Sequence, residues 1–88
     1  MKRADVLETA KQCVTSDRAK EHGDMEDNFA TIASYWSIHL GRNIEPVDVG
    51  IMMALLKAAR AKANPYHEDN YVDGAGYFAC SAECVNVE

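Results

Sequence analysis

Two cations and two carboxylates stand at helical spacing in the second half of the chain. Lys57 and Arg60 lie three residues apart, and Asp69 and Asp73 lie four residues apart. Residues at these separations share one face of a helix, so each pair presents its charges together. Two carboxylates can hold a Mg²⁺ ion that also binds phosphates, while a guanidinium and an ammonium can both bind phosphate. If the two helices face each other, these four residues form a site for Mg²⁺ and a phosphorylated ligand.

The same charges also fit an ordinary solvated surface. Acidic residues are favourable in the first turns of a helix and cations near its end, which explains both pairs without a ligand. His22 and Asn28 are further polar candidates beside the first expected turn, where Asp24 is a natural N-cap. We treat His22 and Asn28 as candidate neighbours of the ligand, although a histidine in a surface turn needs no special role.

Length and charge limit the possible functions. The 88 residues suffice for one domain, residues 1–88, with a modest core. Nine Lys and Arg against fourteen Asp and Glu give a net charge of −5. This balance argues against binding a nucleic-acid backbone, because that needs clustered cations. No apolar run in the sequence is long enough to cross a bilayer and no secretory signal is evident, so we expect a soluble, cytoplasmic protein.

The three cysteines are Cys13, Cys80 and Cys84. They cannot all pair within one chain, so we expect reduced thiols. Cys80 and Cys84 are one helical turn apart and could begin a zinc site with a histidine. Structural zinc sites usually have closely spaced ligand pairs in loops, which makes reduced thiols the better interpretation.

Apolar residues recur at helical spacing in four segments, with no convincing strand pattern. The expected helices cover about 3–21, 25–40, 46–63 and 66–84. Gly41 ends the second helix, and Pro46 occupies the first position of the third. The pattern predicts an all-α, single four-helix domain, arranged as an antiparallel bundle.

The same periodicity selects an expected core. The third helix carries an apolar stripe of Val49, Met52, Leu55, Leu56 and Ala59. The fourth carries a stripe of Tyr71, Ala75, Phe78 and Ala82. We expect Trp36, Leu55, Leu56 and Phe78 to meet in one core.

Small residues are frequent on the last two expected helices. Gly74 and Gly76 weaken a helix, so they should allow close packing, leave room for a ligand beside Asp73, or mark a kink. A surface with so many small side chains also predicts a two-fold homodimer. These small residues are Ala58, Ala59, Ala61, Gly74, Ala75 and Gly76.

An ordered set of residues between about positions 6 and 83 carries a family resemblance. The set is Asp17-Arg18, His22-Gly23-Asp24, Asn28-Phe29, Ile32-Ala33, Trp36, Asp48-Val49, Lys57-Ala58-Ala59-Arg60, Asn64-Pro65, His67, Asp69-Asn70, Asp73 and Gly76-Tyr77. It resembles a family of short, functionally uncharacterised phage and prophage proteins. More distantly, the Lys-x-x-Arg helix and the acidic helix with its Gly-Tyr pair are similar to a phage nucleotide-modification-associated domain and to the all-α MazG-like nucleoside triphosphate pyrophosphohydrolases.

The resemblance implies a MazG-like fold that binds a phosphorylated nucleotide or related small molecule and self-associates. MazG-like enzymes hold magnesium with a Glu-Glu-x-x-Glu helix and a Glu-x-x-Asp helix. Here Asn70-x-x-Asp73 stands in place of the second motif and the first is absent, whereas hydrolysis normally needs three to four carboxylates to hold the metals and activate a water. Mg²⁺-dependent, pyrophosphohydrolase-like chemistry therefore stays open. The alternative is a non-enzymatic helical interaction module whose acidic surface inhibits or redirects a host protein.

Overall fold

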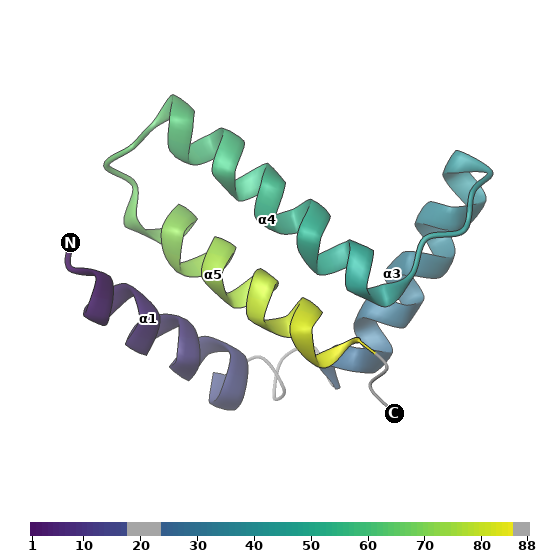
Figure 1. The fold of residues 1–88 in the computed structure, drawn as a ribbon, viewed down its shortest axis with the longest axis horizontal. Helices are drawn as coiled ribbons and strands as arrows, with labels where there is room; N and C mark the ends of the chain where they lie inside the picture. The colour runs from purple at the N-terminus through teal and green to yellow at the C-terminus, as the bar shows by residue number, and fades with distance from the viewer. Residues whose placement is uncertain (18–23, 86–88) are drawn as a thin grey trace.

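The structure, a computed structural model, describes residues 1–17 and 24–85, and these residues form helices and no strand. The elements are α1 (Arg3–Gln12), a π-helical turn η1 (Cys13–Asp17), α3 (Met25–Leu40), α4 (Pro46–Ala63) and α5 (Glu68–Glu83), as Figure 1 shows. The predicted all-α helical bundle is confirmed.

Local signals fix most helix ends. Asp24 caps α3 by accepting a hydrogen bond from the Glu26 backbone N–H at 3.1 Å. Gly41 closes α3 in the left-handed conformation, with φ of 66°. Pro46 is the first residue of α4, as predicted. The first helix differs, because α1 ends at Gln12 and passes into η1, and the rest of that prediction lies outside the described residues.

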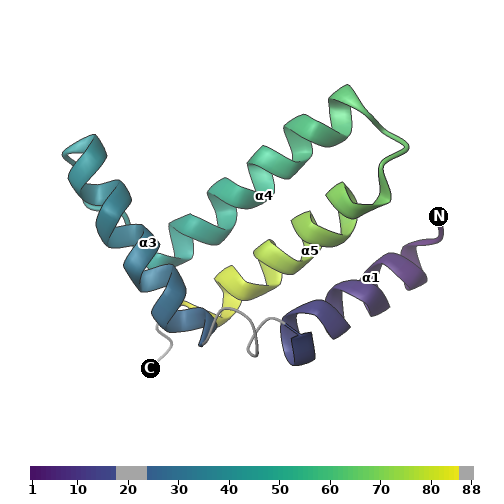
Figure 2. The same cartoon turned by 180° about the vertical axis from the view of Figure 1, so that it is seen from behind.

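Three helices form a layer, with α5 between α1 and α4 (Figures 1 and 2). Helix α3 crosses the end of this layer where α4 begins and α5 ends. The core lies at this crossing, where Phe29 and Ala33 of α3 are buried with Val49 and Cys80. The Phe29 ring packs against Tyr77 with ring centroids 6.5 Å apart. A small apolar core therefore joins α3 to the α4–α5 pair.

Helices α4 and α5 approach most closely at Gly50. A Cβ at this position would overlap the Ser81 hydroxyl and lie 2.6 Å from the Tyr77 carbonyl oxygen. The Ser81 hydroxyl donates a hydrogen bond to the Val47 carbonyl oxygen at 2.8 Å, and Ser81 is buried. Only glycine at position 50 permits this contact between backbones.

Most of the predicted apolar stripes of α4 and α5 does not face the core, which is a correction, whereas Val49 of the α4 stripe is fully buried in the core as predicted. Leu55 is 64% exposed and Phe78 is 63% exposed, and Leu56 is also exposed. Trp36, in contrast, packs half-buried against the core as expected. The close approach at Gly50 explains the difference, because backbones this near leave room only for small side chains between them.

The two glycines of α5 serve packing. Helix α5 continues through Gly74 and Gly76 without interruption. A Cβ at Gly76 would lie 3.1 Å from the Val14 side chain of η1, and one at Gly74 would lie 3.6 Å from the Lys57 Cβ. Val14 therefore fills the space beside Gly76, and close helix packing is the interpretation that the structure supports.

A serine ties the α3–α4 loop to α3. The Ser37 hydroxyl accepts a hydrogen bond from the Ile44 backbone N–H at 2.8 Å and donates one to the Ala33 carbonyl oxygen at 2.7 Å. The loop is thereby held against the last turns of α3. Among the described residues, none of the helices combines the length and apolar character needed to cross a membrane.

Candidate functional site

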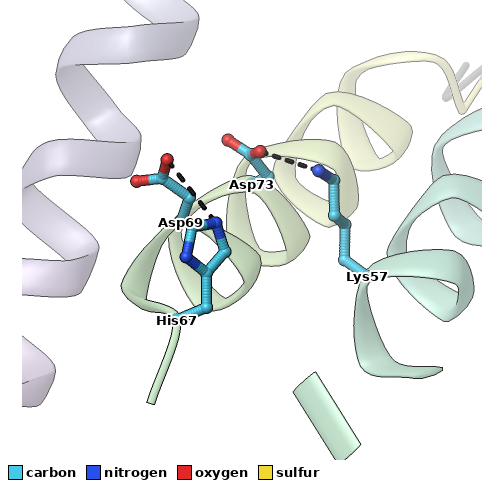
Figure 3. Close-up of polar contacts among 4 residues, drawn as sticks. All are labelled: Lys57, His67, Asp69 and Asp73. Carbon is cyan, nitrogen blue, oxygen red and sulfur yellow. Dashed lines mark ion pairs between the residues drawn. The ribbon is translucent and has the colours of Figure 1, made fainter. Parts of the chain in front are cut away.

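The charged pairs of α4 and α5 meet at one ion pair. The Lys57 Nζ lies 3.0 Å from an Asp73 carboxylate oxygen, and the two side chains are only 15% and 26% exposed (Figure 3). Lys57 can reach Asp73 because Gly74, the next residue on α5, lets the Lys57 stem lie close to the helix. The cationic face of α4 and the acidic face of α5 thus adjoin at this ion pair.

Asp69 extends the acidic face one turn towards the start of α5. Its side chain is 78% exposed, and a carboxylate oxygen lies 4.0 Å from the His67 Nε2, as Figure 3 shows. This contact is an ion pair only when His67 is protonated. Asp69 is therefore accessible from solvent, in contrast to the half-buried Asp73.

Arg60 lies one turn beyond Lys57 on α4. It is exposed and forms no ion pair with any residue of the described ranges. Arg60 lies in the last turn of α4, where its guanidinium is exposed to solvent. Arg60 thus continues the cationic face that Lys57 begins.

The other two predicted residues are not part of this cluster. Asn28 is exposed in the first turns of α3 and adjoins Phe29, which packs at the far end of α5. His22 lies outside the described residues. The structure therefore brings Lys57 together with Asp73, has Asp69 and Arg60 on adjoining turns, and separates Asn28 from them.

Sequence reasoning did not include two polar residues among the site residues. His67 lies beside Asp69, and Asn70 is buried at the start of α5. The position of His67 two residues before Asp69 could have indicated that the two side chains lie close together. Burial of Asn70 depends on how α4 covers α5, which the sequence alone does not show.

The metal-binding capacity of the described residues is limited. In residues 1–17 and 24–85, no three His, Cys, Asp or Glu side chains gather as potential metal ligands. Asp69 and Asp73 provide two carboxylates on successive turns, which suits a Mg²⁺ ion that takes its remaining ligands from water and phosphate. Two carboxylates by themselves do not form a closed metal cage.

Cys13, Cys80 and Cys84 form no disulfide with one another in the structure. Cys80 is buried, and the half-buried Cys84 Sγ lies 3.8 Å from the Met25 Sδ. Burial raises the pKa of the Cys84 thiol, and the nearby carboxylates of Glu26 and Glu83 raise it further. An apolar, acidic setting of this kind disfavours a thiolate, which is the form that binds metals.

These features define a small all-α domain with adjoining cationic and acidic helix faces. Residues 5–85 match the domain of unknown function DUF6378, and the chain belongs to this family. It is 42% identical over 73 residues to the Gene 55 protein of Mycobacterium phage L5, a match that covers 82% of this chain and 47% of the phage protein. It is 39% identical over 75 residues to the Gene 55 protein of Mycobacterium phage D29, covering 85% of this chain and 50% of that protein.

The comparisons confirm the expected relationship to phage proteins. The chain spans about half the length of the two curated relatives. No solved structure matches it with significance.

Proposed function

We propose that this domain binds a phosphorylated nucleotide or a related small molecule together with Mg²⁺ at Lys57, Arg60, Asp69 and Asp73. The contact of 3.0 Å between Lys57 and Asp73 carries the proposal, because it joins the cationic face of α4 to the acidic face of α5. The choice of ligand class follows the resemblance, drawn from the sequence alone, of the Lys57-x-x-Arg60 helix and the acidic helix to a nucleotide-modification-associated phage domain and to MazG-like proteins.

Each residue has a distinct role in this proposal. Asp69 and Asp73 supply carboxylate oxygens for one Mg²⁺ ion, which is commonly held by one or two carboxylates and by phosphates. Lys57, beside Asp73, places a point charge near the bound phosphate. Arg60 offers a planar, two-pronged contact to phosphate from its exposed position. Asn28, which the structure separates from these four residues, has no role in the proposal.

The proposal is for binding, with hydrolysis left open. Metal-dependent hydrolysis of phosphate esters commonly uses two ions held by several carboxylates. The described residues offer only the Asp69 and Asp73 pair at this place. Pyrophosphohydrolase-like chemistry would need ligands from a second chain or from residues that the structure does not describe.

Calorimetric titration with nucleoside triphosphates and Mg²⁺ tests the proposal. We expect binding by the wild type and a raised melting temperature, since a ligand at a hundred times its dissociation constant stabilises by about 2.7 kcal/mol. Asp69→Asn should abolish the Mg²⁺ dependence, and Arg60→Lys should weaken binding because an ammonium lacks the two-pronged contact. Arg42→Lys, an exposed change in the α3–α4 loop, serves as the matched control.

The structure favours Asp69 over Asp73 for this experiment. Asp73→Asn would leave the half-buried Lys57 without its carboxylate and would lower stability as well as any affinity. Asp69 is exposed, so its replacement separates the two effects. If no nucleotide gives heat of binding with the wild type, the proposal is refuted. Equal binding by all variants would show that the site lies at other residues.

A second candidate function is the non-enzymatic interaction module. It is favoured by α3, where the large apolar side chains of Tyr35 and Ile38 are exposed, Ile38 to 80%. Exposed apolar side chains in a group mark sites of protein contact. In this case Ile38→Glu, and not Asp69→Asn, should abolish binding to a purified host target, and no nucleotide should bind.

A further inference from the structure

An apolar stripe runs along the outer side of α5. Its members are Tyr71, Ala75, Phe78, Ala82 and Val85. All but Ala75 are exposed, and Ala75 is half-buried. The spacing between them is four, three, four and three residues, which is the repeat by which one helix packs along another. Within the described residues, no helix covers this stripe.

Four members of the stripe, Ala75, Phe78, Ala82 and Val85, line an open apolar groove. Leu7 of α1 lies on one side of the groove, and Val47 and Ile51 of α4 lie on the other. None of the residues lining the groove is ionisable. The lining residues come from α1, α4 and α5, the three helices that form the layer in Figures 1 and 2.

We propose that this face binds a second copy of the chain, so that two α5 helices pack antiparallel around a two-fold axis at Phe78. The stripe is nearly symmetric about Phe78, with members seven and three residues before it and four and seven residues after it. An antiparallel pairing therefore brings Phe78 onto Phe78, Ala75 near Ala82, and Tyr71 near Val85 of the second copy. Such self-complementarity is what a two-fold interface requires.

Charge favours a second copy at this face. The chain carries a net charge of −5, so two copies repel each other unless they meet where carboxylates are absent. At about 100° per residue, Asp69 and Asp73 lie on the far side of α5 from Phe78. The two acidic faces therefore point away from each other in this dimer, and the charged cluster stays open to solvent.

The exposure of the face also suits a dimer. A standard interface buries about 800 Å² on each partner. The groove has no ionisable residue in its lining, and Leu7, Phe78 and Val85 leave 62%, 63% and 48% of their surface in water, so they form an exposed apolar patch of the kind that marks an interaction site. Pairing two such faces removes most of this surface from water, and a polar rim supplies the remaining contact.

The molecular mass of the full chain in solution tests the proposal. Light scattering on the wild type should give twice 9.7 kDa. Phe78→Glu and Phe78→Lys should each give the monomer mass, because each sets two like charges against one another at the axis. Phe78 is 63% exposed in the single chain, so circular dichroism and the urea midpoint should report that both variants remain folded. Ile38→Glu on α3 is the matched control and should remain dimeric.

Mixing the two charged variants tests the symmetry itself. Equal amounts of Phe78→Glu and Phe78→Lys should restore the dimer mass, because position 78 faces position 78 of the other copy. A wild type that is monomeric at high concentration would overturn the proposal and leave the groove to another protein or to the further length of the longer relatives. A dimer that persists in Phe78→Glu, or a mixture that stays monomeric, would overturn the placement of the axis at Phe78.

Discussion

Ser81 of α5 places its hydroxyl where residue 50 of α4 would carry a Cβ. The hydroxyl also donates to the Val47 carbonyl oxygen, so the contact is polar as well as close. This one pairing sets the distance between α4 and α5, and with it the side of each helix that faces inward.

Gly50→Ala should destabilise the protein by about 1–3 kcal/mol, because the added methyl group meets Ser81 and the Tyr77 carbonyl oxygen. Gly74→Ala is the control, since its Cβ would make an ordinary contact of 3.6 Å with Lys57 and should stabilise α5 by about 0.5–1 kcal/mol. Urea unfolding followed by circular dichroism measures both. Equal effects of the two changes would contradict the close approach at Gly50.

The ion pair between Lys57 and Asp73 should show energetic coupling. Lys57→Met and Asp73→Asn should each lower the free energy of unfolding. In a double-mutant cycle, we expect the loss in the double variant to be smaller than the sum of the two single losses by roughly 1 kcal/mol. The cycle of His67→Gln and Asp69→Asn, at 4.0 Å and in solvent, should show no measurable coupling at neutral pH. Equal coupling energies from the two cycles would mean that the ion pair of Lys57 with Asp73 does not stabilise the protein more than the solvent-exposed pair does.

Ser37→Ala should lower stability by about 1–3 kcal/mol, since the Ile44 backbone N–H would lose its acceptor in a half-buried loop. Ser34→Ala is a suitable control, because the exposed Ser34 hydroxyl bonds only to the Ala30 carbonyl oxygen of its own helix. Thermal unfolding of both variants provides the comparison. A neutral Ser37→Ala would show that the loop finds another acceptor.

Cys84 should resist alkylation at neutral pH. Burial and two carboxylates raise the pKa of this thiol, so the protonated, unreactive form persists to higher pH than in the unfolded chain. By linkage, this group favours the folded state below the unfolded thiol pKa, and the contribution is lost as the pH rises through the folded pKa. Iodoacetamide rates measured against pH by mass spectrometry, in a Cys13→Ser, Cys80→Ala background, give the pKa directly.

A second variant identifies the cause of that shift. Glu26→Gln should lower the pKa of the Cys84 thiol, because one of the two nearby carboxylate charges is removed. The same protein in urea is the reference. Coincident rate profiles for the folded and unfolded chains would refute the shift.

Helix positions were predictable from the sequence because their signals are local. Gly41 and Pro46 act through their own backbone conformations, and Asp24 acts through its immediate neighbours. The core was not predictable to the same degree. Periodicity shows that Tyr71 and Phe78 share a face, but which neighbour covers that face depends on where α4 approaches α5.

The candidate site was also predictable only in part. The spacings within each charged pair predicted that Lys57 and Arg60, and likewise Asp69 and Asp73, adjoin one another, and the short turn between the helices brings Lys57 to Asp73. Asn28 lies near the end of another helix, and its distance from the cluster depends on how α3 crosses the layer. That crossing follows from the burial of Phe29 and Ala33 against Val49 and Cys80. Helical spacing places Phe29 and Ala33 on one apolar face, but it does not show which helices cover that face.

The central position of α5 has a consequence for the order of folding. Helices α4 and α5 are joined by a few residues, so their pairing closes only a short loop and loses little chain entropy. The contact of Val14 with Gly76 joins distant parts of the chain and closes a far longer loop. We therefore expect α4 and α5 to form a helical hairpin early, and α1 to dock onto a surface that this hairpin has already built.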